Sequence, residues 1–126
     1  MLPAAWVLKA QKLRRFWRDQ VLKLFEDVDA ILAPAAPMRA PELGQKTAMF
    51  GGIELPVRAN LGIFTQPISF IGLPVAAVPV WLGHDTLPVG VQVIAAPWRE
   101  DVCLRIAHQL EMAGVCAAPV AAGFAH

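Results

Sequence analysis

Side chains for nucleophilic catalysis are scarce in this chain of 126 residues. It has a single serine, Ser69, within Pro-Ile-Ser-Phe-Ile. That context differs from the Gly-x-Ser-x-Gly turn that exposes a nucleophilic serine in α/β hydrolases. Gly51-Gly52 is followed by Ile-Glu-Leu and indicates only a turn. We therefore expect a loop hydroxyl at Ser69 and no catalytic residue in this chain.

The cysteines do not have the spacing of a metal site. Cys103 and Cys116 lie 13 positions apart and are not part of a Cys-x-x-Cys pair. Neither has a ligand spacing to the three histidines, which are His84, His108 and His126. We expect two reduced thiols in a cytoplasmic protein, with no metal and no cofactor. Cys103 is predicted to lie on the buried side of a helix, and His108 on its exposed side.

The composition is more apolar than that of an ordinary small domain. Hydrophobic residues make up 56% of the chain and charged residues 17%, whereas globular chains average roughly 45–50% and about 25%. A short chain has a high ratio of surface to volume and should need more polar surface. The excess predicts that another protein part covers apolar surface, or that this surface contacts lipid. The net charge of +1 gives no reason to expect a nucleic-acid partner.

A membrane span is the alternative interpretation of residues 59–83, which contain no charged side chain and are numerous enough to cross a bilayer. Pro67, Pro74 and Pro79 interrupt this segment, and each removes a helix hydrogen bond that lipid cannot replace. The first residues also lack the positive region of a signal peptide, and charges at 9–18 break any apolar core. We therefore expect no membrane partner.

Two helices are predicted from periodic apolar positions. Residues 4–27 have an apolar stripe typical of a helix packed on a sheet, and a membrane-surface helix is the alternative. The stripe consists of Trp6, Ala10, Leu13, Trp17, Val21, Leu24 and Val28. The second helix spans Glu100 to Ala113 and begins with acidic residues, which the helix dipole favours. Residues 114–126 are expected to form a loosely ordered tail.

Three strands are predicted between these helices. Residues 28–34 are apolar on both sides, which is typical of a strand buried on two faces. Residues 75–81 and 89–95 are rich in β-formers and are expected to form an antiparallel hairpin, with Gly83 and Asp85 in its turn. Pro79 has no N–H, and it is therefore expected at a strand position that donates no hydrogen bond to a neighbouring strand. The remaining segments are predicted as a loop at 34–58, a short helix or turn at 60–67, and a loop at 67–74.

Four segments, in order, resemble the amidase signature hydrolases, and the likeness extends from Trp6 to Gly114. Residues 27–34 resemble a late strand of that family with its proline stop, and residues 64–74 resemble its Thr-x-Pro to Gly-Leu-Pro segment. Residues 87–94 resemble the Leu-Pro-x-Gly-x-Gln strand, and residues 97–108 resemble the last helix. Within the family, residues 55–69 and 94–101 most resemble the 1-carboxybiuret hydrolase branch, which acts in s-triazine breakdown.

The resemblance implies an α/β fold, namely the C-terminal portion of an α/β/α sandwich around a mixed sheet. Residues 1–126 would then be a C-terminal fragment of one amidase domain. The family cleaves C–N amide bonds by acyl transfer, with a nucleophilic serine, a bridging cis-serine and a lysine that all lie upstream of the matched region. The single serine of this chain cannot supply both of these catalytic serines. The chain is therefore expected to be inactive alone, and its expected partner is the missing N-terminal amidase part or a homologous subunit.

The resemblance also implies a set of substrate-binding residues. Thr65, Gln66 and Ser69 occupy the family's loop that faces the active site, with Arg58 and Asn60 close in sequence. Their polar groups suit a small amide or urea-like substrate, and Arg58 is either a partner for a substrate carboxylate or a solvated loop charge. Two other functions stay open: a binding or assembly module that docks on a partner through an apolar sheet face, and a small membrane-associated protein.

Overall fold

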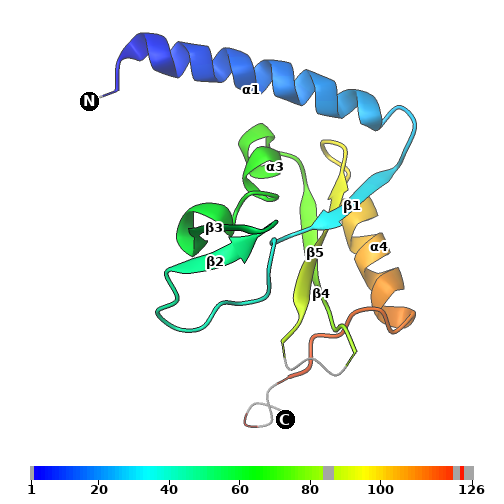
Figure 1. The fold of residues 1–126 in the computed structure, drawn as a ribbon. Coiled ribbons are helices and arrows are strands. Elements are labelled where there is room, and N and C mark those ends of the chain that lie inside the picture. Colours follow the sequence, from blue (N-terminus) through cyan, green and yellow to red (C-terminus); the bar gives the residue numbers. More distant parts are fainter. Residues whose placement is uncertain (1, 84–86, 121–122, 124–126) are drawn as a thin grey trace.

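The computed structural model describes residues 2–83, 87–120 and 123 (Figure 1). The predicted positions His84, Asp85 and His126 lie outside these residues. The elements in chain order are α1 (Ala4–Leu24), β1 (Ala30–Pro34), β2 (Thr47–Phe50), β3 (Ile53–Pro56), α2 (Val57–Asn60), α3 (Gln66–Ile71), β4 (Val75–Val80), β5 (Val89–Ala95) and α4 (Glu100–Met112).

The main sheet has the strand order β1-β5-β4, and both pairs are antiparallel. Val93 of the central strand β5 lies opposite Leu32 on one side and Ala76 on the other. The predicted pairing of the strands at 75–81 and 89–95 is confirmed, because the whole of β4 pairs with residues 89–94 of β5. The α/β class is confirmed as well.

Helices cover both faces of this sheet, as Figure 1 shows. Ile94 packs in a cluster with Val21 and Ile71, which come from α1 and α3. Its neighbour Ala95 packs on the opposite face against Val102 of α4. Successive side chains of a strand point to opposite faces, so one strand supplies both clusters. The order helix, sheet, helix is the layering that the resemblance implied.

The first helix packs much less than its apolar stripe predicted. Among its described residues only Val21 is buried, whereas Trp6 is 69% exposed and Leu13 is 62% exposed. The helix ends at Leu24, three residues before the predicted end, and residues 25–27 form turns. In Figure 1 the N-terminal half of α1 extends beyond the other described elements, which leaves its stripe uncovered.

The predicted loop at 34–58 was wrong in part, because it contains a small antiparallel hairpin. β2 and β3 are four residues long and pair in register from Phe50–Ile53 outward. The intervening Gly51 and Gly52 have φ angles of 58° and 86°. Two consecutive residues with positive φ form the two-residue turn that matches strand twist, and glycine adopts it at no steric cost. The predicted glycine turn is therefore confirmed, and it joins two strands.

The predicted loop at 67–74 was also wrong, since α3 occupies most of it. Pro67 lies in the first turn of this helix, where a missing N–H removes no helical hydrogen bond. Gly72 ends the helix with a left-handed φ of 71°, and its N–H donates to the carbonyls of Ile68 and Ser69. This is the usual glycine stop of a helix.

The strand predicted at 28–34 begins at Ala30, and it is not buried on two faces in the described structure. β1 pairs only with β5 there, and Leu32 is 56% exposed. The other edge strand, β4, contains Pro79, whose carbonyl accepts the N–H of Ala117. Within one strand residue the nitrogen and carbonyl point to the same side. The Pro79 nitrogen therefore faces away from β5, as predicted.

Two residues of the predicted tail at 114–126 are held against β4. Cys116 is buried and forms a β-bridge with Val80. The carbonyl of Ala117 accepts the indole N–H of Trp81 at 2.9 Å.

The glycine of the Leu-Pro-x-Gly-x-Gln segment has a steric role. A Cβ atom on Gly90 would lie 2.9 Å from the Cβ of Ala35. The Gly90 carbonyl accepts the N–H of Ala35 at 2.8 Å, so the two backbones must approach closely. A side chain at this position would force them apart.

Candidate functional site: the loop that leads into α3

The predicted substrate-binding residues lie where α2 turns into α3, and one carbonyl organises the turn. The Gly62 carbonyl accepts the N–H groups of Thr65 at 3.1 Å and Gln66 at 2.8 Å. The hydroxyl of Thr65 donates to the same carbonyl at 3.3 Å. The Thr65 side chain is half-buried and thus supports the backbone of the loop.

Ser69 is exposed one turn further along α3. Its hydroxyl donates to the Thr65 carbonyl at 2.7 Å, and its N–H donates to the same atom at 2.9 Å. Such back-bonding from a serine to the carbonyl four residues earlier is a local backbone interaction. Within the described part of the chain no basic side chain is recorded as a partner of this hydroxyl. The hydroxyl is hydrogen-bonded, but it belongs to a helix and not to the loop expected from the sequence.

The Gln66 side chain lies over the backbone of Gly62. A Cβ atom placed on Gly62 would be 2.9 Å from Gln66 Nε2 and 3.1 Å from its Cγ. Glycine at 62 therefore leaves the space that the carboxamide occupies. Gln66, Pro67, Ser69 and Phe70 line an open cavity of about 560 Å³. An exposed carboxamide at its rim can both donate and accept hydrogen bonds.

Ser69 also lines a second cavity, of about 400 Å³. Arg18 from α1 and Glu100 from α4 line it, so it has charges of both signs. Trp98 also lines it, is 89% exposed, and has a φ of 65°, the one positive φ of a non-glycine residue among those described. A bulky residue in this conformation is strained, and such residues cluster at functional sites. Ser69 lines both cavities, which gives the loop a central position.

Arg58 and Asn60 lie earlier, on α2. Arg58 is exposed. The Asn60 amide donates to the Pro56 carbonyl at 2.8 Å, and so it fixes the start of its own helix. The structure thus brings Thr65, Gln66 and Ser69 together. It does not place Arg58 or Asn60 among the described residues that line the two cavities.

Sequence reasoning missed Gln92 as a residue of this region. It belongs to the central strand β5, is 2% exposed, and is the one buried polar residue among those described. Its Nε2 donates to the carbonyls of Pro34 at 2.8 Å and Phe64 at 3.2 Å. The signal was a single amide in an otherwise apolar strand, which must have partners if it is buried.

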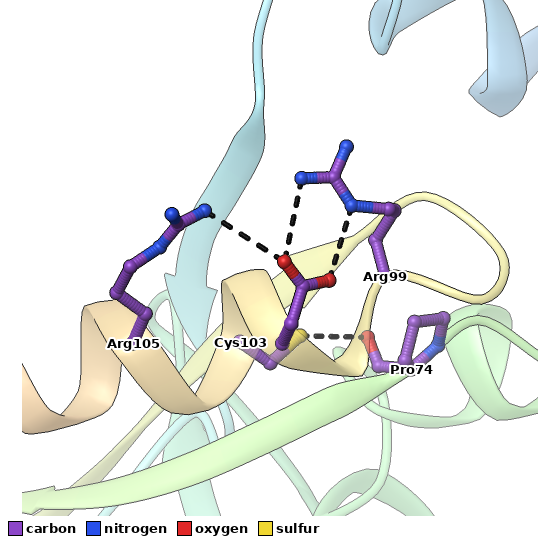
Figure 2. Close-up of polar contacts among 5 residues, drawn as sticks. Pro74, Arg99, Cys103 and Arg105 are labelled. Atoms are coloured by element: carbon purple, nitrogen blue, oxygen red, sulfur yellow. Dashed lines mark hydrogen bonds and ion pairs between the residues drawn. The ribbon is translucent and has the colours of Figure 1, made fainter.

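Charged groups at the start of α4 form an exposed cluster. Asp101 accepts from Arg99 Nε at 3.1 Å and lies 3.8 Å from the Arg105 guanidinium. The hydrogen bond from Arg99 lowers the pKa of Asp101, and the same bond raises the pKa of Arg99. Figure 2 shows the guanidinium groups of Arg99 and Arg105 with this carboxylate between them. Exposed pairs of this kind contribute little to stability.

The thiol of Cys103 lies on the inner side of the same helix. It donates to the Pro74 carbonyl at 3.4 Å, as Figure 2 shows. Burial raises the pKa of the Cys103 thiol. Cys103 and Cys116 are both free and buried. This environment is typical of a structural cysteine and not of a nucleophile.

Residues 2–83, 87–120 and 123 contain no candidate metal site and no candidate membrane span. No group of three or more His, Cys, Asp or Glu side chains there is placed to hold a metal ion. None of the helices in that part of the chain combines the length and apolar character that a bilayer span requires.

Known proteins resemble this chain over most of its length. The amidase family profile matches residues 2–104. AtzE, a 1-carboxybiuret hydrolase subunit of Pseudomonas sp. (strain ADP), is 47% identical over 114 residues, which cover 90% of this chain and 25% of that protein. A glutamyl-tRNA(Gln) amidotransferase subunit of Geobacter metallireducens is 42% identical over 110 residues, covering 86% of this chain and 21% of that protein.

Solved structures of related proteins also match this chain. A structure described as a vestigial protein complex that reveals the origins of an s-triazine catabolic enzyme matches with a TM-score of 0.88 and 44% identity, covering 95% of this chain and 26% of that one. A glutamyl-tRNA(Gln) amidotransferase subunit of Thermotoga maritima matches with a TM-score of 0.70 and 35% identity, covering 85% and 22%. The chain thus spans about a quarter of the length of these relatives. It belongs to the amidase family.

Proposed function

We propose that this chain forms one wall of the substrate pocket of an amidase that hydrolyses C–N bonds in small amide or urea-like substrates. Activity requires what we call the completed domain, which is this chain together with the remainder of an amidase domain, either continuous with it or supplied as a second chain. The observation that carries the proposal is that Gln66 and Ser69 line one open cavity and that Ser69 also lines a second. The 47% identity to a 1-carboxybiuret hydrolase subunit supports the substrate class.

The chemical step belongs to the remainder of the completed domain. Acyl transfer by a serine needs an activated hydroxyl with a base in reach. The one serine of this chain donates its hydroxyl proton to the Thr65 carbonyl and has no such base among its recorded partners. The contribution of the chain is therefore binding and orientation, for which Gln66 is the main residue. Arg58 is a partner for a substrate carboxylate if the completed domain turns α2 toward the pocket.

A partner protein is the second part of the proposal. The relatives are described as a protein complex and as subunits of a hydrolase and of an amidotransferase. In this chain, exposed apolar side chains at the N-terminal half of α1 are available for such a contact, among them Trp6, Leu8 and Leu13. This observation also favours the alternative function, an assembly module, and the sheet offers exposed apolar side chains as well, with Leu32 of β1 56% exposed. The free thiols are in keeping with a cytoplasmic location.

The test replaces Gln66 by Leu in the completed domain, with a urea-like amide as substrate. We expect KM to rise about tenfold with little change in kcat, because a binding contact that is equal in ground and transition states is lost. Gln109→Leu, on the exposed side of α4, is the matched control and should leave KM unchanged. An unchanged KM together with a lower unfolding midpoint in urea would make Gln66 a structural residue and the loop no part of the pocket.

A further inference from the structure

The buried amide of Gln92 raises the question of what it does in an apolar sheet. A carboxamide without hydrogen-bond partners is costly to bury. Gln92 avoids that cost by giving its two N–H groups to two carbonyls, those of Pro34 and Phe64. These acceptors are 58 and 28 residues away along the chain, so the amide joins three separate segments at one point.

The bond to Phe64 acts on the loop of the candidate site. Phe64 directly precedes Thr65, and a peptide group is planar. The carbonyl of Phe64 and the N–H of Thr65 therefore belong to one rigid plane. Gln92 holds the carbonyl end of this plane at 3.2 Å, while the Gly62 carbonyl accepts the N–H end at 3.1 Å. Bonds at both ends fix how the plane is oriented, and thereby where the chain enters α3 at Gln66.

The bond to Pro34 gives this arrangement a rigid base. Pro34 is the last residue of β1 and pairs with Val91 of β5, beside Gln92. The Pro34 carbonyl lies at the shorter distance, 2.8 Å, and belongs to the sheet. The bond to Pro34 thus holds the Gln92 amide on the sheet, and the bond to Phe64 connects it to the loop. A side chain so held has one orientation, as precise positioning requires.

We propose that Gln92 is a positioning residue, which fixes the loop at 61–66 so that Gln66 faces the substrate. It has no contact with substrate in this assignment and acts through the Phe64–Thr65 peptide plane. The consequence for catalysis rests on the function proposed above, whereas the effect on the loop does not. The residue type follows from the geometry, because a glutamate would place carboxylate oxygens against two carbonyls and a methionine would offer no donor.

The experiment measures amide hydrogen exchange by NMR in the completed domain for Gln92→Met. We expect the Thr65 and Gln66 amides to lose protection by at least tenfold, while the ladder amides of β4 and β5 change by less than twofold. Gln109→Met is the control and should alter neither set. Equal loss of protection in the loop and in the ladder would mean that Gln92 contributes only to general stability. Unchanged protection of the Thr65 and Gln66 amides would also overturn the proposal.

Kinetics in the same variants separate this proposal from the proposed function. We expect KM to rise in Gln92→Met about as much as in Gln66→Leu. A loop that is released without any KM effect in either variant would refute the pocket assignment and leave the positioning intact. A KM effect in Gln66→Leu alone would overturn the positioning role. If Gln92→Met does not fold, Gln92→Asn is used, since it keeps a buried amide but shortens its reach, and it should release the loop in the same way.

Discussion

The indole N–H of Trp17 donates a hydrogen bond to the carbonyl of Pro67 across 3.2 Å, and this bond joins α1 to α3. The guanidinium of Arg14 lies 5.7 Å from the centre of the Phe70 ring and adds a second contact between the same helices. Pro67 and Phe70 both line the cavity beside Gln66. The position of α1 is therefore linked to the candidate site through two residues of its wall.

Replacing Trp17 by Phe tests this link. The variant keeps an aromatic ring and removes the donor, so we expect the completed domain to lose about 0.5–1.5 kcal/mol of unfolding free energy, measured by urea denaturation. Trp6→Phe is the matched control: Trp6 is 69% exposed, and phenylalanine keeps an apolar ring for the proposed partner contact, so stability should change by less than about 0.5 kcal/mol. Equal effects of the two substitutions would show that the bond to Pro67 contributes nothing specific.

Gly62→Ala should act on binding more than on stability. The added Cβ would lie 2.9 Å from Gln66 Nε2, the mobile end of a flexible side chain, which can move away. We expect a change in unfolding free energy below about 1 kcal/mol and a rise in KM in the completed domain, because the carboxamide leaves its place. Combining Gly62→Ala with Gln66→Leu should give no further rise in KM. Additive effects of the two changes would mean that Gly62 acts independently of Gln66.

Most of the longer elements of this chain and the strand β1 could be predicted from sequence, whereas the hairpin β2–β3 and the helix α3 could not. The strands β4 and β5 and the helix α4 are defined by runs that alternate or repeat over six residues or more. The hairpin at 47–56 has strands of four residues, too short for an alternation to stand out among glycines and prolines. Pro67 suggested a loop because proline ends most helices, although it is compatible with the first turn.

The exposure of α1 and the role of Gln92 lay beyond single-sequence reasoning for a different reason. An apolar stripe such as that of Trp6 and Leu13 shows which side of a helix can be buried, but not which other element is present to bury it. The contacts of Gln92 depend on residues 28 and 58 positions away, and a local pattern contains no information on such pairs. The proximity of Thr65, Gln66 and Ser69 followed from their closeness in sequence, and local hydrogen bonds link them; their role in binding substrate stays a prediction.

The Cys103 thiol should react slowly and only at high pH. Burial raises its pKa, so less thiolate is present at pH 8 than for an ordinary cysteine, whose pKa is about 8.5. We expect alkylation by iodoacetamide in the folded protein to be at least tenfold slower than in urea. The raised pKa stabilises the folded state below the unfolded pKa, and this contribution disappears as the pH rises through the folded value. Stability should therefore fall more steeply above pH 8.5 in the wild type than in Cys103→Ala.

This chain without the remainder of the domain should not hydrolyse amides. Its one serine hydroxyl is hydrogen-bonded to the Thr65 carbonyl, and a nucleophile needs a base in that place. The purified chain would be assayed against acetamide, benzamide and biuret-type substrates, with release of ammonia as the readout. Ser69→Ala is the decisive comparison, because it removes the only serine and costs no more than one local hydrogen bond. Turnover above background that is lost in Ser69→Ala would make Ser69 a nucleophile, and the assignment of the chemical step to the remainder of the domain would then be wrong.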